Sequence, residues 1–424
     1  MLLYPNLRLW RQGRSWLRLA TIPLLTILSI DFFITISLSS SLRQVSLSSA
    51  PSNIVARKDR IFIASMHWNT ELILRSHWSA ALLDLVRYYG MDNVYISIVE
   101  SGSLDDTKGA LKDLDTELGK LGVERSIELL DITHKDEVER IPNLDEKGWI
   151  QTSRATKELR RIPYLAKLRN RVMEKLKKLA DGTDGQKERS FDKILWLNDV
   201  IFTTEDIITI LTTRDGNYAA ACAIDFSKPP LFYDTFALRD IEGEKPIMQT
   251  WPFFLAGESR NAIKTHAPVP VKSCWNGIVV FQAEPFYENS SLRFRGVQDS
   301  LAQYHLEGSE CCLIHADNSL SLTKGVWLNP KVRVSYNAEA DSVVKSKRGK
   351  WPSKIEVLEG IWYNRWARWT GFLKRYTERF LVQIRVQRWR SEALVAGKAE
   401  VHEKGVYCLV NEMQVLRENG WAHI

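Results

Sequence analysis

The stretch Asp192–Phe202 reads DKILWLNDVIF, in which an apolar run stops at Asn198 and Asp199 and then resumes. Such a short apolar run predicts a buried strand, which we place at residues 196–202. A carboxylate beside a buried strand is costly unless it has a partner or a task. The stretch therefore predicts a strand that brings an acid to one edge of a sheet.

The segments before this strand alternate between two patterns. Residues 60–65 and 94–99 are apolar runs typical of strands, whereas residues 72–89 and 107–121 have apolar positions at helical spacing. This alternation predicts an α/β domain with a parallel sheet, which we place at residues 59–340. Within it we further expect a strand at 127–131, a basic helix at 164–179, a surface loop at 181–190, and strands at 219–225 and 277–281.

Length and charge limit the class of protein. The 424 residues suit one large α/β domain with appendages as well as two small domains. An excess of 58 Lys and Arg over 51 Asp and Glu gives a net charge of +7, which suits partners that carry phosphate. The five cysteines have neither zinc-type spacing nor a dense disulfide framework. A disulfide between two of Cys222, Cys274 and Cys311 or Cys312 is compatible with the sequence, which does not assign the pair.

The N-terminus has the composition of a membrane anchor. Four arginines between residues 8 and 18 precede a mainly apolar window at 19–38, about the length that crosses a bilayer. The charge bias predicts a cytosolic tail at 1–18, a transmembrane signal anchor at 19–38 and a lumenal stem at 39–58. A cleaved signal peptide is the alternative. A glycosylation sequon at Asn289 agrees with a lumenal domain, so we expect no nucleic-acid partner despite the basic charge.

Two polar clusters lie where the predicted sheet would bind a ligand, because open parallel sheets bind ligands at the carboxyl ends of their strands. Glu100, Ser101 and Gly102 follow one strand, and the acid could accept ribose hydroxyls or a base edge. Arg169 and Asn170 lie on the basic helix, and an Arg suits a diphosphate. The alternatives are an ordinary strand-to-helix turn for the first cluster and a solvated helix face for the second.

Asn198 and Asp199 form a third cluster. Metal-dependent sugar transferases of the GT-A type place an Asp-x-Asp at a strand end, where a carboxylate holds a divalent cation against a diphosphate. Here Leu197 replaces the first Asp and Asn198 is the middle residue, which we expect to contact the donor. Asp199 is the second Asp of the motif and the expected metal-binding acid. The alternative is a helix cap before Thr203.

The second half of the domain supplies further candidates. Polar residues between aromatic rings suit carbohydrate binding, which makes Asp234, Trp275 and Asn276 candidate acceptor-binding residues. Asp240 and Glu310 are candidate catalytic carboxylates, and Glu310 precedes a predicted short strand at 311–314. His315 is a candidate late metal contact. The alternatives are that the aromatic residues fill the core and that the histidine is structural.

Residues 341–424 are basic and rich in Trp, which predicts a helical extension. Amphipathic helices of this composition lie either on a membrane surface or on the domain itself. We expect docking on the domain.

A set of ordered motifs resembles the fungal capsule-associated α-1,3-mannosyltransferases between about residues 60 and 336. The motifs are residues 62–71 (FIASMHWNTE), 97–103 (SIVESGS), 164–170 (YLAKLRN), 197–200 (LNDV), 232–235 (FYDT), 239–243 (RDIEG), 273–277 (SCWNG), 294–296 (FRG) and 309–311 (SEC). The resemblance implies a type II Golgi membrane protein with a GT-A-like domain behind its anchor. It also implies mannose transfer from GDP-mannose to a mannose-containing glycan in α-1,3 linkage, with a divalent cation such as Mn²⁺ or Mg²⁺.

We therefore expect an anchored lumenal glycosyltransferase of capsule or cell-wall polysaccharide synthesis. The alternative is a noncatalytic component of a secretory polysaccharide assembly that binds nucleotide sugar or polysaccharide.

Overall fold

The computed structural model describes residues 21–23, 25–26, 29–30, 32–33, 59–152, 154, 156–182, 188–288, 292–346, 351–397 and 401–424. The predicted tail at 1–18, the stem at 39–58 and the sequon at Asn289 lie outside these residues, and so does much of the predicted anchor at 19–38. Among the described residues, no helix combines the length and the apolar character needed to cross a membrane.

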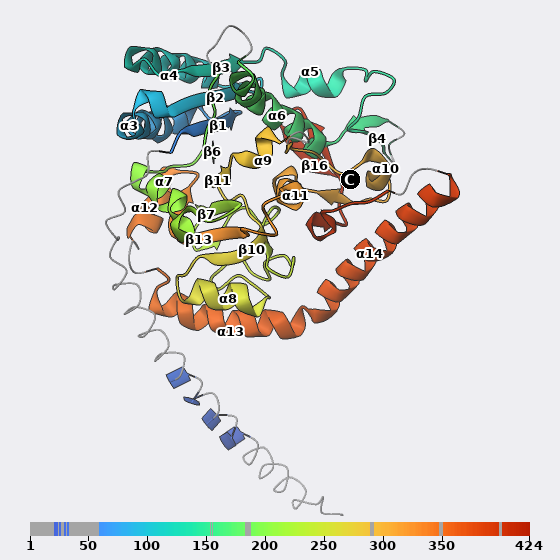
Figure 1. Ribbon diagram of the computed structural model, residues 1–424. Helices are drawn as coiled ribbons and strands as arrows, with labels where there is room; N and C mark the ends of the chain where they lie inside the picture. Colours follow the sequence, from blue (N-terminus) through green and yellow to red (C-terminus); the bar gives the residue numbers. More distant parts are fainter. Residues whose placement is uncertain are drawn as a thin grey trace, which may run out of the picture.

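The described residues form a mixed α/β structure around one ten-stranded sheet, whose main path is β3-β2-β1-β6-β11-β7-β13-β10-β9 (Figure 1). The first four strands on this path pair in parallel. They are β1 (Ile61–His67), β2 (Val94–Glu100), β3 (Arg125–Leu129) and β6 (Lys193–Leu197). The predicted α/β class and the parallel arrangement of this half are confirmed.

Helices cover both faces of the parallel half and create two apolar cores. On one face the apolar sides of three helices pack against Ile63 and Ile96: α3 (Ser79–Tyr89), α4 (Thr107–Leu121) and α7 (Thr204–Leu211). On the other face α6 (Arg161–Ala180) packs against Phe62 and Trp196. The short α2 (Glu71–Ile73) and a π-helical turn (Leu74–Trp78) precede α3. The predicted helix at 107–121 has the bounds of α4, and that at 164–179 lies within α6.

The other half of the sheet mixes directions. β11 (Ile278–Gln282) runs antiparallel to both β6 and β7 (Ala220–Lys228), and β7 runs parallel to β13 (Val326–Ser335). The sheet is completed by β8 (Leu231–Phe232), β9 (Arg239–Asp240) and β10 (Val269–Ser273). Smaller elements around it are α5 (His134–Glu139), β4 (Trp149–Gln151), β5 (Lys157–Leu159), α8 (Gly257–Lys264), α9 (Glu284–Tyr287), α10 (Asp299–Ala302) and β12 (Glu307–Gly308). The direction of the chain therefore reverses where β6 meets β11.

Two predicted strands need correction. The strand placed at 196–202 is β6, which spans Lys193–Leu197 and ends before Asn198, and the strand placed at 311–314 is wrong. Residues 311–314 belong to α11 (Glu310–Asp317), a helix whose start is capped by the Ser309 hydroxyl accepting the backbone N–H of Cys311 at 3.2 Å. A run of four apolar residues does not distinguish a buried strand from a buried helix. Here the cap before the run determines the outcome.

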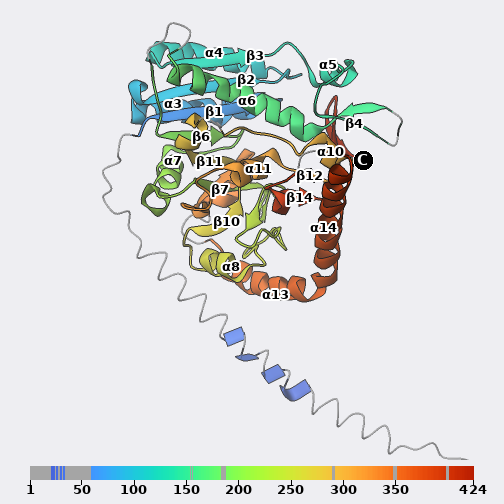
Figure 2. The same ribbon diagram turned by 45° about the vertical axis from the view of Figure 1, so that its right-hand side comes forward.

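The C-terminal residues return to the body of the molecule (Figure 2). After α12 (Ala338–Ser346), α13 (Lys354–Thr370) crosses beneath α8, and α14 (Phe372–Val395) turns up along the side. The chain ends in β14 (Leu409–Val410), β15 (Gln414–Arg417) and β16 (Gly420–His423). β14 pairs with β12, and Val415 bridges to Arg160 before α6. The domain boundary at 340/341 stays a prediction, but these late strands pack against the earlier domain.

α13 lies very close to the body along its inner face. Val357 and Ile361 join the apolar core, and a Cβ added at Gly360 would stand 2.0 Å from the carbonyl oxygen of Trp251. Only a residue without a side chain permits this approach. The expected docking of this helix on the domain is confirmed.

Candidate active site

The loop after β6 carries Asn198 and Asp199 at the point where the sheet changes direction. The Asn198 backbone N–H donates to the Gly277 carbonyl at 2.9 Å, and its side-chain oxygen accepts the Trp275 indole N–H at 3.0 Å. Asp199 follows as a partly exposed acid, and burial raises its pKa above the usual range. The segment Trp275–Gly277 from the start of β11 thus holds Asn198 in place and leaves the Asp199 carboxylate at the sheet edge.

Glu100 ends β2 at the same edge. His67 of β1 pairs with Glu100, and Leu197, the last residue of β6, pairs with Ser65 of β1, so Asp199 follows β6 at the same end of the sheet. Glu100 thus ends β2 and Asp199 follows β6, two strands away across β1, where neighbouring strands are about 5 Å apart. The structure brings these two predicted residues to one side of the sheet, as the strand order requires.

The carboxylate of Glu100 is buried and only half satisfied. Its Oε1 accepts the Ser103 backbone N–H, whereas Oε2 has no hydrogen-bond partner within the described chain, and the Lys108 Nζ stands 3.9 Å away. Buried polar atoms in folded proteins are rarely unpaired without a reason. Glu100 Oε2 therefore has the position and chemistry of a ligand acceptor.

Two more unpaired polar atoms lie nearby. The Trp68 ring, just after β1, stacks on the His134 ring at 4.3 Å, and the His134 ring meets Tyr164 of α6. The Trp68 Nε1 and the His134 Nδ1 are both buried without a hydrogen-bond partner among the described residues. Burial lowers the pKa of His134 to about 4, so this ring is neutral at pH 7. Sequence reasoning missed both residues as site candidates, although Trp68 lies within a motif of the family resemblance.

Ser101 and Gly102 shape the turn after Glu100. The Ser101 N–H donates to the His67 carbonyl at 3.0 Å. Gly102 has a φ of +71°, and an added Cβ would stand 2.2 Å from the Ile132 carbonyl oxygen. Only glycine fits this close approach. Both residues therefore position Glu100 through the backbone.

Arg169 points from α6 into the interior. Its Nε donates to Glu310 at 3.1 Å, and its guanidinium lies over the Trp275 ring at 4.4 Å and the Trp196 ring at 5.2 Å. Asn170 uses its amide to bond both backbone groups of Phe294, at 2.8 and 3.0 Å. Arg169 and Glu310 thus form a buried ion pair beneath Trp275, whereas Asn170 is engaged in holding the 292–296 segment.

A second cluster of acids faces Asn198 from the antiparallel half. Asp225, at the end of the apolar part of β7, accepts hydrogen bonds from the Asn276 side chain at 2.8 Å, the Asp234 backbone at 3.2 Å and the Tyr336 hydroxyl at 3.1 Å. The Tyr336 hydroxyl also bonds the Asn198 side chain. Burial, reinforced by the charge of Asp234, raises the pKa of Asp225 to about 7. These contacts connect Asp225 and Asn276 to the Asn198–Asp199 loop.

Asp225 was not among the predicted site residues, although a signal for it exists. An apolar strand ending on an acid is the same pattern that identified Asp199, and residues 219–225 repeat it. Tyr336 has no comparable signal, because it lies 111 residues from Asp225 in the sequence. The predicted acceptor residues Asp234 and Asn276 both belong to this cluster.

Asp240 and His315 lie in structural surroundings. Both oxygens of Asp240 accept backbone N–H groups, from Glu242, Glu244 and Ala256, which fixes the loop after β9. The His315 Nε2 donates to the Cys274 carbonyl at 2.7 Å, and its ring stacks on Phe281. Within the described ranges, no group of three or more His, Cys, Asp or Glu side chains could hold a metal ion. The catalytic role of Asp240 and the metal role of His315 stay predictions.

Two disulfides brace this region. Cys222 of β7 is bonded to Cys274, which precedes Trp275, and Cys312 of α11 is bonded to Cys408. The first pair is one of those that the sequence left open, and the second involves a cysteine outside that set. Cys311 is free and buried. The first disulfide directly fixes the segment that contacts Asn198.

Comparison with known proteins places the chain in a family. The family model described as Cryptococcal mannosyltransferase 1 matches residues 60–317, more than half of the chain. The chain belongs to this family. The resemblance drawn from the motifs is thereby confirmed. Alpha-1,3-mannosyltransferase CMT1 of Cryptococcus neoformans var. neoformans serotype D is 26% identical over 302 residues, which are 66% of this chain and 58% of the relative's length.

Solved structures give only distant likenesses. A Pyrobaculum calidifontis mannosyltransferase, solved with GDP-Man and Mn²⁺, is 11% identical with a TM-score of 0.34, over 86% of this chain and 87% of that one. S. aureus TarS 1–349 is 10% identical with a TM-score of 0.35, over 65% and 60% of the two chains. TM-scores of this size carry no argument about this chain.

Proposed function

We propose that this protein is a glycosyltransferase that transfers mannose from GDP-mannose to a mannose-containing glycan in α-1,3 linkage, with a GT-A-like domain and a divalent cation. Family membership supports the reaction class. The observation that carries the proposal is the meeting of two acids, Glu100 and Asp199, at the edge where the parallel strands end and the sheet reverses. Ligands of open α/β sheets bind at such an edge.

Glu100 has the properties of a donor-binding residue. Its buried Oε2 has no hydrogen-bond partner among the described residues and only the Lys108 Nζ 3.9 Å away, so a hydroxyl or N–H group of a nucleotide would satisfy an acceptor that otherwise carries a desolvation penalty. The Trp68 Nε1 and the His134 Nδ1, which also have no hydrogen-bond partner in the described part of the chain, lie at the same end of the sheet. We infer that the nucleoside part of the donor contacts these three atoms.

Asp199 has the chemistry of a cation ligand. It is a hard oxygen donor at the mouth of the site, its pKa is raised by burial, and no cationic side chain contributes to that shift. A divalent cation usually takes one or two carboxylates from the protein and completes its coordination with phosphate oxygens and water. The lack of a three-ligand cluster in the described residues is therefore compatible with Mn²⁺ or Mg²⁺. When bound, such a cation would act as a Lewis acid on the leaving diphosphate.

The opposite side of the site suits the acceptor. Asp225 and Asn276 hold each other through their side chains, and the Asp234 backbone completes the contact. We infer that Asp234 and Trp275 bind acceptor hydroxyls and a sugar face. Glu310 is the candidate catalytic carboxylate, with Arg169 holding its orientation. Arg169 would also add positive potential near the departing diphosphate.

The proposed compartment is the Golgi lumen, with a type II anchor at 19–38 and a role in capsule or cell-wall polysaccharide synthesis. The disulfides Cys222–Cys274 and Cys312–Cys408 support an oxidising compartment, since such bonds are rare where glutathione keeps thiols reduced.

Asp199→Ala tests the proposal. The purified full chain in detergent is given GDP-mannose, Mn²⁺ and a mannoside acceptor, and GDP release and product are measured. We expect Asp199→Ala to lower transfer by at least about a hundredfold, because it removes stabilisation of developing charge, with unchanged thermal unfolding.

The matched control is Glu205→Ala, which removes an exposed acid six residues further on and should retain activity. Undiminished transfer by Asp199→Ala would refute the cation role. Binding of GDP-mannose by the unaltered chain without turnover would instead favour the noncatalytic interpretation.

A further inference from the structure

The helices α13 and α14 meet in an elbow that projects from the body of the molecule (Figures 1 and 2). The inner face of α13 contacts the core, whereas its outer face and the start of α14 carry large apolar side chains. We call this surface the aromatic elbow; it consists of Tyr363, Trp366, Trp369, Phe372, Leu373 and Tyr376, which are 58–72% exposed.

The first half of α14 exposes its apolar face and turns its polar face toward the protein. A surface helix normally buries its apolar face and exposes its polar one. Here the described buried residues of α14 begin at Val382, while Phe372, Tyr376 and Phe380 are exposed and their rings stack one above the next at 6.2 Å. The helix therefore presents an aromatic ladder to the outside.

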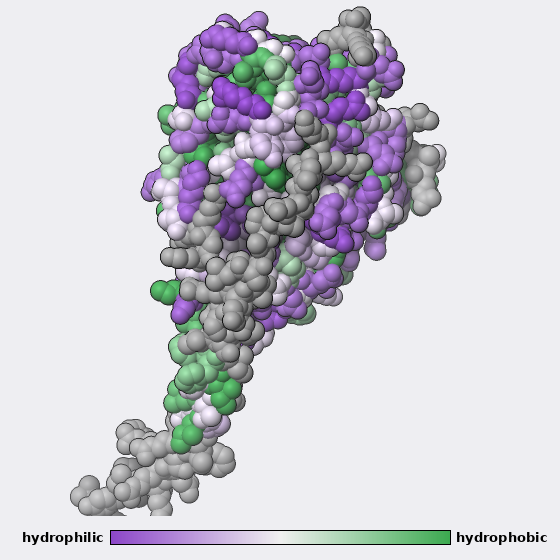
Figure 3. Space-filling view, turned by 60° about the vertical axis from the view of Figure 1, so that its left-hand side comes forward, coloured by the Kyte–Doolittle hydropathy of each residue, from purple (hydrophilic) through white to green (hydrophobic). Residues whose placement is uncertain are grey.

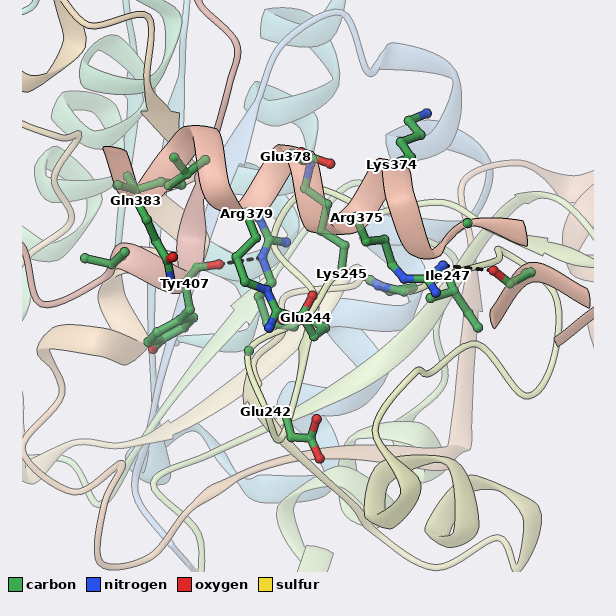
Figure 4. A pocket seen from close by; sticks show the side chains of 18 of the residues that line it. Glu242, Glu244, Lys245, Ile247, Lys374, Arg375, Glu378, Arg379, Gln383 and Tyr407 are labelled. Atoms are coloured by element: carbon green, nitrogen blue, oxygen red, sulfur yellow. Dashed lines mark hydrogen bonds and ion pairs between the residues drawn. The ribbon is translucent and has the colours of Figure 1, made fainter. Parts of the chain in front are cut away.

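Polar residues instead face the protein (Figure 4). Glu378 pairs with Lys245 at 2.5 Å, and Arg379 pairs with Glu244, across a cavity of about 710 Å³ between α14 and the 242–247 loop. Ion pairs rather than apolar packing thus hold this part of the helix to the body.

Outside the elbow and the predicted anchor at 19–38, exposed apolar residues are more scattered. Leu144 and Leu322, for example, are almost fully exposed but are not part of a comparable helical stripe. The face shown in Figure 3, toward α3 and α12, is largely hydrophilic over the folded body. Single exposed apolar residues need no explanation, but a contiguous patch marks an interaction site.

The charge around the elbow is positive. α13 and α14 together contain nine Lys and Arg against four Glu. Arg260 and Lys264 of α8 lie beside Arg365 and Arg368 of α13, and burial followed by these positive neighbours lowers the pKa of Lys264. Such an accumulation of cations favours an anionic partner.

We propose that the aromatic elbow docks on the surface of a bilayer that contains anionic phospholipids. Trp and Tyr rings prefer the membrane–water interface, and neighbouring Lys and Arg bind phosphate groups. Docking through the aromatic elbow would fix the orientation of the domain relative to the membrane. This docking is independent of the reaction that the domain catalyses.

Hydrogen exchange of the full chain with nanodiscs tests this proposal. The discs contain phosphatidylcholine with or without phosphatidylserine. Peptides covering residues 363–376 should exchange at least about tenfold more slowly on the anionic discs, and high salt should reverse the difference.

The elbow variant Trp366→Ser/Trp369→Ser/Leu373→Ser should lose this protection. The control variant Leu144→Ser/Leu322→Ser changes exposed apolar residues elsewhere and should keep it. All five side chains are at least 65% exposed, so both variants should unfold at the temperature of the unaltered chain. Equal exchange on the two kinds of disc would overturn the proposal. Protection that follows protein concentration rather than lipid would overturn it too, and would assign the elbow to a second copy of this chain.

Discussion

Replacing Asp225 by Asn tests the charge state of the acid cluster. Asp225 is completely buried with a pKa of about 7, against about 3.9 in an unfolded chain. Because the folded-state pKa is the higher one, the protonated acid stabilises the fold fully below about pH 4, and this contribution is lost as the pH rises to about 7. A shift of about three pKa units corresponds to about 4 kcal/mol.

Asn is neutral at all these pH values and nearly isosteric with Asp. Its oxygen can accept the bonds from Asn276 and Asp234, and its amide can donate to the Tyr336 oxygen. Asp225→Asn should therefore be more stable than the unaltered chain by about 4 kcal/mol at pH 8 and by only about 1 kcal/mol at pH 4.5. For a folded part of this size, these values correspond to rises in Tm of about 5 and about 1 °C.

Thermal unfolding of both proteins at the two pH values is the assay. Asp240→Asn is the matched control, because both oxygens of Asp240 accept backbone N–H groups and an amide there would lose at least one bond. This control should lower Tm at both pH values. A fall in Tm for Asp225→Asn at pH 8, or an equal rise at both pH values, would refute the reasoning.

Two further changes test the interior around the site. Glu310→Ala should lower the free energy of unfolding by about 3–5 kcal/mol in a denaturant titration, because it leaves the Arg169 charge buried and unpaired. Glu310→Gln keeps an oxygen acceptor for Arg169 and should lower the free energy of unfolding by less. Equal decreases for the two variants would show that the charge pair does not contribute to stability. Replacing both Cys222 and Cys274 by Ala should cost about 4 kcal/mol, since the bond closes a loop of 52 residues. The fluorescence of Trp275 should also change in this variant. An unchanged free energy of unfolding would contradict the stabilising role of this disulfide.

The local parts of the fold were predictable from sequence. The helix at 107–121 begins after polar capping residues and ends at Gly122, which has a φ of +73°, so both boundaries are encoded nearby. Strands β1 and β2 were likewise predictable from their own apolar runs. The half of the sheet with mixed strand directions was harder to predict from sequence, because the pairing of β11 with β6 and β7 depends on contacts between distant segments.

The candidate site likewise has a part that was predictable from local sequence and a part that was not. Glu100 and Asp199 were predictable because the first ends an apolar strand and the second closely follows one, and parallel strands end at one edge. The connection between Tyr336 and Asp225 was not, since a tyrosine after a late strand has no distinctive pattern. Nor was the bond between Cys312 and Cys408, because cysteine positions alone do not determine connectivity.

The place of Cys408 near the end of the chain affects synthesis. Its partner Cys312 emerges from the ribosome 96 residues earlier, directly beside the unbonded Cys311, while Cys222 and Cys274 are by then both available to each other. During translation the adjacent thiols of Cys311 and Cys312 are therefore both present before Cys408, which has to pair with the second of them. A stop codon before residue 408 would leave Cys312 without its partner and would remove β14, which pairs with β12.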